Sequence, residues 1–138
     1  MVYLVDDDSE DLEIVQQALF EHSYKGPVLT LGNGKRLIEK LTTDNGEEKP
    51  EVIVLDLNMP LVDGFETLSR IRQHPVFQKT PVIILTASSN KADEERCYAL
   101  GCNSFLTKPS KMSDYKELTV LIKQFLGSQA ASRDVRRG

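Results

Sequence analysis

The sequence alternates between short, continuously apolar segments and longer segments whose apolar residues recur at helical spacing. Continuous runs rich in β-branched residues are typical of strands buried in a parallel sheet. We expect strands at Val2–Val5, Val28–Leu31, Val52–Leu55, Val82–Leu85 and Ser104–Leu106. The periodic segments predict helices over about 10–22, 34–43, 64–73, 91–100 and 112–126. Because strands and helices alternate, we predict an α/β fold, a doubly wound five-stranded parallel sheet with helices on both faces.

A single domain accounts for this pattern. The chain has 138 residues, 40% of them hydrophobic, which is enough for one core and leaves little room for a second. Gly127 stands where the last helix is expected to end, since glycine often terminates a helix. The segment after it has almost no apolar residues and cannot bury a hydrophobic face. We therefore predict one domain over residues 1–127 and a disordered tail over residues 128–138.

Composition argues against two classes of partner. Lys plus Arg total 17 and Asp plus Glu total 21, which gives a net charge of −4, whereas a nucleic-acid-binding domain usually carries a basic patch. The longest apolar runs are far shorter than the roughly 20 residues that span a bilayer. The N-terminus has no basic segment and no cleavage site of a secretory signal. We expect a cytoplasmic protein with no nucleic-acid partner and no membrane partner.

The two cysteines, Cys97 and Cys102, do not form a C-x-x-C pair, and no further metal ligands cluster near them in the sequence. We interpret them as reduced thiols, at least one of them in the core. A redox or metal-binding role is therefore not expected.

Polar residues follow the predicted strands. The first strand is followed by Asp6, Asp7 and Asp8, the third by Asp56, the fourth by Thr86 and the fifth by Lys108. The carboxyl ends of parallel strands share one edge of the sheet, and ligands bind there. Carboxylates gathered at that edge repel one another unless a cation intervenes, and Mg²⁺ is held by carboxylates, waters and phosphate oxygens. An aspartate beside the metal can attack phosphorus, while a lysine and a hydroxyl bind the other phosphoryl oxygens. The sequence thus predicts a phosphoryl-acceptor site.

Each of these residues also has an ordinary structural interpretation. The three consecutive aspartates could cap the first helix, Thr86 could be a strand-end hydroxyl, and Lys108 could be a solvated surface lysine. Asp56 is harder to explain in this way, because an unpaired charge next to the buried run Val52–Leu55 is costly. The joint placement at four strand ends favours the functional interpretation.

Four motifs stand in order along the chain: Tyr3-Leu4-Val5-Asp6-Asp7-Asp8, Val54-Leu55-Asp56-Leu57-Asn58-Met59-Pro60 with Asp63-Gly64, Ile84-Leu85-Thr86-Ala87, and Phe105-Leu106-Thr107-Lys108-Pro109. Together they resemble the receiver domains of two-component response regulators, from residue 2 to about 126. The resemblance implies a flavodoxin-like fold with strand order 2-1-3-4-5, in which the first and third strands lie side by side.

The resemblance also implies a role for each site residue. Asp56 would accept the phosphoryl group, and Thr86 and Lys108 would bind it. The peptide bond between Lys108 and Pro109 is expected to be cis. Thr86 is also expected to act as a switch together with Phe105, which lacks a hydroxyl and would signal through its packing alone.

A divalent cation, Mg²⁺ or Mn²⁺, is implied by the same motifs. Asp7 would be a direct ligand beside Asp56, and Asp6 would bind through water. Asn58 would contribute its backbone carbonyl. No role follows for Asp8, which is an additional acid near the site.

The function that the resemblance predicts is that of a stand-alone response regulator. Its phosphate would come from a sensor histidine kinase or a histidine phosphotransfer protein, and it would be a switch and not an enzyme, apart from weak autophosphorylation and autodephosphorylation. Residues 128–138 are too few for a DNA-binding domain, so the output is expected through protein contacts. These would use the surface of the fourth helix, fifth strand and fifth helix, in a homodimer or with another protein. The acidic Asp44–Glu48 loop and the Thr86–Asn90 stretch resemble single-domain, phytochrome-associated regulators.

Three other functions stay open at this stage. A phosphohydrolase with an aspartyl-phosphate intermediate would need an acid two residues after its nucleophile, where this chain has Asn58. A dinucleotide-binding module would need a G-x-G-x-x-G turn after the first strand, where three aspartates stand. A pseudo-receiver that is never phosphorylated is disfavoured because the acceptor, metal and lysine positions are intact.

Overall fold

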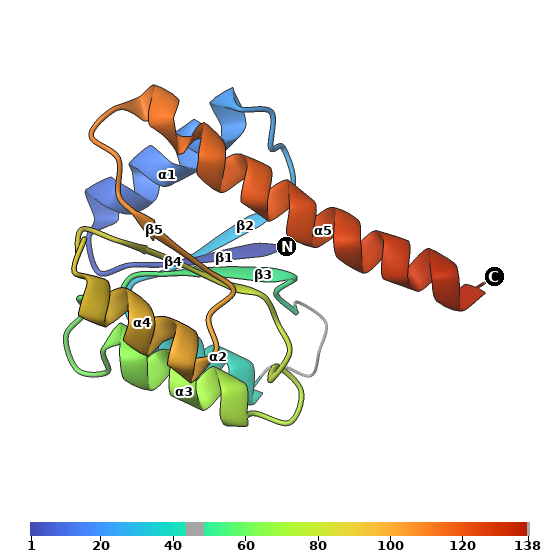
Figure 1. Ribbon diagram of the computed structural model, residues 1–138, viewed down its shortest axis with the longest axis horizontal. Coiled ribbons are helices and arrows are strands. Elements are labelled where there is room, and N and C mark those ends of the chain that lie inside the picture. The colour runs from blue at the N-terminus through green and yellow to red at the C-terminus, as the bar shows by residue number, and fades with distance from the viewer. Residues whose placement is uncertain (44–48, 138) are drawn as a thin grey trace.

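The computed structural model of the chain is a three-layer α/β sandwich, in which a parallel sheet lies between two layers of helices (Figure 1). The structure describes residues 1–43 and 49–137, with side chains up to residue 127. The acidic Asp44–Glu48 loop, from which a resemblance to phytochrome-associated regulators was inferred, lies outside the described residues.

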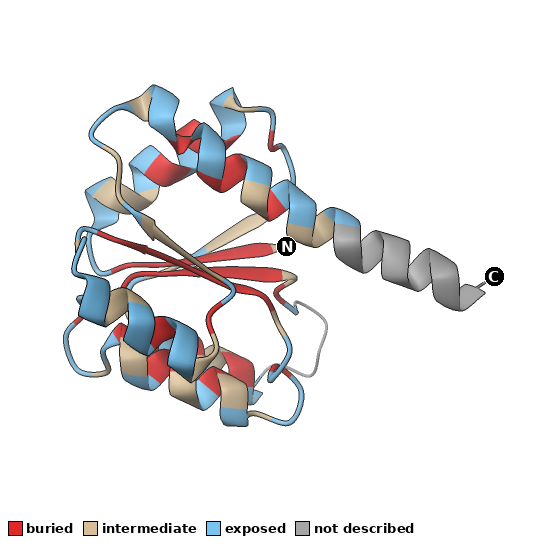
Figure 2. Ribbon diagram, viewed as in Figure 1, coloured by how far each residue is buried: buried red, intermediate tan, exposed pale blue. Residues whose placement is uncertain are grey.

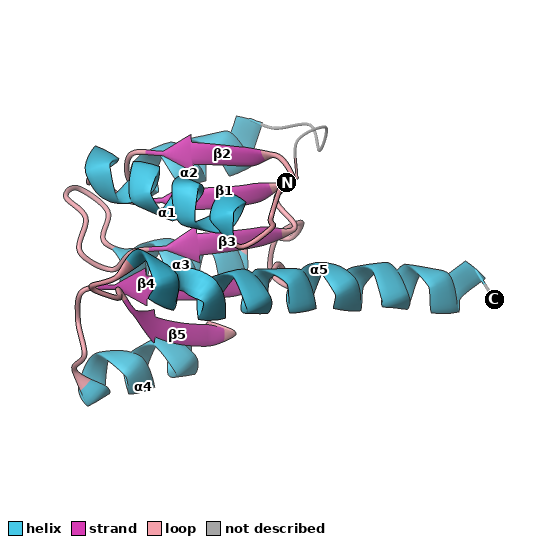
Figure 3. Ribbon diagram, turned by 90° about the horizontal axis from the view of Figure 1, so that it is seen from above, coloured by secondary structure: helices cyan, strands magenta, loops and turns pink. Residues whose placement is uncertain are grey.

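Strands and helices alternate along the chain as the apolar pattern predicts. The strands are β1 (Val2–Val5), β2 (Val28–Leu31), β3 (Val52–Leu55), β4 (Val82–Thr86) and β5 (Ser104–Thr107). The helices are α1 (Ser9–Glu21), α2 (Gly34–Thr43), α3 (Gly64–Gln73), α4 (Lys91–Leu100) and α5 (Lys116–Arg137), with a 3-10 turn, η1 (Met112–Tyr115), before α5. All neighbouring strands are parallel, in the order β2-β1-β3-β4-β5, and their arrows in Figure 3 point to one side. The predicted flavodoxin-like fold is confirmed.

Different helices bury the two faces of the sheet. Alternate residues of β1, β3 and β4 point to opposite faces, so that one set packs against α2, α3 and α4 and the other against α1 and α5. The three central strands are therefore buried along their whole length, whereas the edge strands β2 and β5 are only partly buried (Figure 2). This difference explains why the central strands are continuously apolar and β5 has a weaker pattern.

The last helix differs from its predicted limits. The backbone of α5 is helical to Arg137, past the end predicted at Gly127. A glycine inside a helix costs only about 1 kcal/mol relative to alanine, so it does not by itself end the helix. The disorder of residues 128–138 stays a prediction, because their side chains lie outside the described part of the chain. In the part of the chain that the structure describes, no helix is both long and apolar enough to cross a membrane.

Both cysteines are buried free thiols, as predicted. Burial raises the pKa of Cys97 to about 12 and that of Cys102 to about 11. Because the thiolate is the reactive form, both side chains are inert near neutral pH and belong to the core.

Candidate functional site

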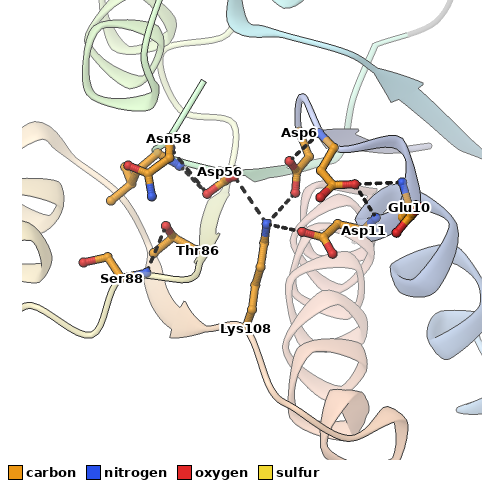
Figure 4. A network of polar contacts seen from close by, with 10 residues as sticks. Asp6, Glu10, Asp11, Asp56, Asn58, Thr86, Ser88 and Lys108 are labelled. Atoms are coloured by element: carbon orange, nitrogen blue, oxygen red, sulfur yellow. Dashed lines mark hydrogen bonds and ion pairs between the residues drawn. The ribbon is translucent and has the colours of Figure 1, made fainter. Parts of the chain in front are cut away.

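Polar side chains from four strand ends meet at the carboxyl edge of the sheet (Figure 4). Asp6 follows β1 and Asp56 follows β3, and the N–H of Asp56 donates to the carbonyl of Val5 across the paired strands, at 3.0 Å. Thr86 is the last residue of β4, and its carbonyl accepts the N–H of Lys108 at 2.7 Å. The sheet therefore places the predicted acceptor, lysine and hydroxyl at one edge.

The ammonium group of Lys108 joins three carboxylates. Its Nζ lies 2.7 Å from Oδ2 of Asp6, 2.8 Å from Oδ2 of Asp11 and 3.3 Å from Oδ2 of Asp56. Burial by itself lowers the pKa of Lys108, but the hydrogen bonds to Asp11 and Asp6 and the charge of Asp56 outweigh burial and raise that pKa above its ordinary value. Lys108 is therefore charged at neutral pH and neutralises part of the negative charge at this edge.

Asp56 is held through both of its carboxylate oxygens. Only 5% of the residue is exposed. Its Oδ1 accepts the backbone N–H of Leu57 at 2.8 Å and, more weakly, that of Asn58 at 3.5 Å, while Oδ2 faces Lys108. These contacts hold the carboxylate in one orientation at the end of the central strand β3.

Three of the predicted metal ligands form a cluster. One carboxylate oxygen from each of Asp6, Asp7 and Asp56 lies within 4.8 Å of the others. Burial raises the pKa of Asp6, and the hydrogen bonds from Lys108 and from the backbone of Asp8 offset only part of that rise. Carboxylate oxygens are the ligands that hard divalent cations such as Mg²⁺ and Mn²⁺ prefer, so these residues fit such an ion. The contribution of the Asn58 carbonyl stays a prediction.

The third consecutive aspartate, Asp8, has a structural role. It is the N-cap of α1, and its side chain accepts the backbone N–H groups of Glu10, at 2.9 Å, and Asp11, at 3.3 Å. The helix-capping interpretation is therefore correct for Asp8, while the two preceding aspartates belong to the cluster.

The two predicted switch residues lie on neighbouring strands. Thr86 is buried, and its hydroxyl accepts the N–H of Ser88 at 3.4 Å. Phe105 in β5 is half-buried and packs against the core that lies under α2, α3 and α4. Phe105 therefore shares a core with Cys97 of α4, and the switching itself stays a prediction.

Known proteins are similar to this chain in sequence and in fold. The profile of the response regulator receiver domain matches residues 2–120. This chain belongs to the receiver-domain family. The response regulator Rcp1 of Synechocystis sp. is 32% identical over 128 residues, which are 91% of this chain and 87% of Rcp1.

Two solved structures are similar to this chain in fold as well as in sequence. The phosphorylated cyanobacterial phytochrome response regulator RcpA has a TM-score of 0.79 and 30% identity, covering 90% of this chain and 91% of RcpA. The Mn²⁺-bound form of Rcp1 has a TM-score of 0.77 and 31% identity, covering 91% of this chain and 92% of that one. The receiver family predicted from the motifs is confirmed, and its relatives include a phytochrome response regulator.

Asp11 is a residue of this receiver domain's site that the sequence analysis missed. It lies in the first turn of α1 and does not follow a strand, which is why a search of strand ends passes over it. The available signal was its position, since Asp11 stands in the first turn of the helix that begins directly after Asp6, Asp7 and Asp8. Its short contact with Lys108 makes it a third partner of that lysine.

One predicted backbone feature is wrong. The peptide bond between Lys108 and Pro109 is trans, as are the other described peptide bonds. Trans is favoured at prolines by about 0.5–1 kcal/mol. Lys108 makes its contacts with all three carboxylates with the bond in this isomer.

A glycine allows α3 to start directly against the loop that follows Asp56. A Cβ atom on Gly64 would lie 2.4 Å from the carbonyl oxygen of Asp56 and 2.5 Å from Cα of Leu57. The N–H of Gly64 donates to the carbonyl of Leu57 at 3.0 Å, and Asp63 caps the helix. The close approach of Gly64 to the backbone of Asp56 and Leu57 holds that backbone in place.

Gly64→Ala is expected to lower the free energy of unfolding by about 1–3 kcal/mol, because the added methyl group meets backbone atoms that cannot move aside. Gly127→Ala is the matched control, since a Cβ atom there meets nothing within 4 Å. In a helix this change is expected to be neutral or to stabilise by up to about 1 kcal/mol. Urea denaturation of both variants checks the prediction, which equal effects would contradict.

Proposed function

We propose that this protein is a phosphoryl-accepting switch of a two-component system, with Asp56 as the acceptor. The donor is a sensor histidine kinase or a histidine phosphotransfer protein. The observation that carries the proposal is the 3.3 Å contact between the buried Asp56 carboxylate and the ammonium group of Lys108. Membership of the receiver family supports it, and a solved structure of the similar regulator RcpA is of its phosphorylated form.

The transfer step follows from this arrangement. A carboxylate oxygen of Asp56 attacks the phosphorus of the phosphohistidine, and the P–N bond breaks as the imidazole nitrogen leaves with its electron pair. We assign the attack to Oδ2, because it faces Lys108, the cation that would bind the incoming phosphoryl group, whereas Oδ1 faces the backbone N–H of Leu57. Lys108 and the hydroxyl of Thr86 then bind the phosphoryl oxygens.

A divalent cation, Mg²⁺ or Mn²⁺, completes the proposed site. Asp7 and Asp56 would hold it directly and Asp6 through water, with the backbone carbonyl of Asn58 as a further ligand. When bound, the cation neutralises negative charge on the phosphoryl group during transfer. The Mn²⁺-bound structure of the similar regulator Rcp1 supports this part of the proposal.

The output passes through protein contacts of α4, β5 and α5. Phosphorylation replaces the single charge of the Asp56 carboxylate with the roughly 1.5 to 2 negative charges of a phosphoryl group, at the edge where β5 ends and α4 starts. Phe105 of β5 packs against the core that includes Cys97 of α4. Tyr98 of α4 is 49% exposed, so that an aromatic side chain is available to a partner. The partner is a second copy of the chain or another protein.

The similarity to RcpA supports a phytochrome-type kinase as the phosphate donor. We place the protein in the cytoplasm, where such kinases obtain the ATP that they use.

Asp56→Asn is expected to abolish labelling by acetyl phosphate and Mg²⁺, because an amide oxygen is too weak a nucleophile to displace the phosphoryl group. Asp63→Asn is the matched control in the same loop, since asparagine caps a helix as well as aspartate does. Mass spectrometry of the intact chains measures the labelling. A phosphate on Asp56→Asn at the native level would show that the acceptor is another residue.

Asp7→Asn is expected to weaken Mn²⁺ binding by more than about tenfold, because even residues outside the ligand shell contribute about 10–100-fold to metal affinity. Asp8→Asn removes the same charge from the next residue and preserves the cap of α1, so it is expected to bind nearly as the native chain does. Isothermal titration calorimetry with Mn²⁺ compares the two. Equal losses would mean that net charge, and not ligation by Asp7, holds the ion.

A further inference from the structure

Ser88 connects the site to the start of α4. Its N–H donates to the hydroxyl of Thr86 at 3.4 Å, and its carbonyl accepts the hydroxyl of Thr107 at 3.2 Å. Its own hydroxyl donates to Oδ2 of Asp93 at 2.8 Å. Ser88 is therefore bonded at once to the end of β4, to the end of β5 and to the first turn of α4.

The hydroxyl of Ser88 also takes part in the cap of α4. Asn90 is the N-cap, and its side chain accepts the N–H of Ala92 at 2.8 Å. In a capping box, the acid three residues after the N-cap accepts the N–H of the N-cap directly. Here the N–H of Asn90 donates to the Ser88 hydroxyl at 3.2 Å, and that hydroxyl donates to Asp93. Ser88 thus stands between the two members of the box, which ties the β4–α4 loop to the helix.

This relay bears on Thr86, which the proposed function requires at the phosphoryl group. When the Thr86 hydroxyl turns toward a phosphoryl group on Asp56, it leaves the N–H of Ser88 unless the loop moves with it. Asp93 opposes that movement, because it holds the one hydroxyl hydrogen that Ser88 can donate. Glu94 carries the same charge in the same turn, yet the hydrogen of Ser88 is directed to Asp93.

We propose that Asp93 is a positioning residue that, through Ser88, holds the β4–α4 loop and Thr86 in the resting arrangement and slows phosphoryl transfer to Asp56. The inference rests on the proposed function. It means that the first turn of α4 influences, through Ser88, the rate at which Asp56 is phosphorylated.

The test is the rate of labelling by acetyl phosphate and Mg²⁺ in four single variants. Asp93→Ala and Ser88→Ala each break the relay and are expected to label faster by about three- to tenfold, the range that one lost hydrogen bond allows. Asp93→Asn keeps an oxygen that can accept the Ser88 hydroxyl, and its rate is expected to lie closer to the native rate than to that of Asp93→Ala. Glu94→Ala removes a charge from the same turn and is expected to label at the native rate.

The double variant Ser88→Ala with Asp93→Ala separates the relay from two unrelated effects. If the two residues act through one hydrogen bond, the double variant labels no faster than either single variant. Native or slower labelling by both alanine variants would overturn the inference, as would equal acceleration by Glu94→Ala. If the native chain takes no label at all, the proposed function itself fails, and that result is distinct from unchanged rates in labelled variants.

Discussion

The ammonium group of Lys108 is the interaction on which the site depends. It stands between Asp6, Asp11 and Asp56, two of which are buried. Taking a carboxylate out of water costs several kcal/mol unless a positive partner compensates, and leaving such a group without its partner costs about 3–5 kcal/mol. Two adjacent buried acids at neighbouring strand ends are therefore tolerated only because the strand order brings a lysine from the far edge of the sheet to them.

The arrangement that balances charge also suits the proposed phosphoryl transfer. Asp56 is fixed by main-chain N–H groups on one oxygen and by Lys108 on the other, at the end of the central strand β3. Asp7 remains exposed beside it, so that a cation has access while the proposed acceptor is kept in position. From Thr86, hydrogen bonds continue through Ser88 into α4. Charge at the sheet edge and the position of a surface helix are thus connected by one short chain of bonds.

The sequence predicts the fold well because the central strands are buried on both faces, and only continuous apolar runs satisfy that environment. It also predicts the site residues that directly follow a strand, because the carboxyl ends of parallel strands share one edge of the sheet. It misses Asp11, which reaches Lys108 from a helix, and it leaves Asp8 without a role because three adjacent acids do not reveal which one caps. The contact of Ser88 with Asp93 crosses a loop whose shape no local pattern encodes, and the trans bond after Lys108 runs against what the resemblance implied.

The central claim is that Asp56 itself receives the phosphoryl group. Sodium borohydride reduces an aspartyl phosphate to homoserine and leaves free carboxylates unchanged, so that it marks the acceptor in the native chain without any substitution. After labelling with acetyl phosphate and Mg²⁺, reduction and proteolysis, peptide sequencing by mass spectrometry is predicted to find homoserine at position 56. Homoserine at Asp6, Asp7 or Asp11, or none in a chain that carries phosphate, would contradict the account.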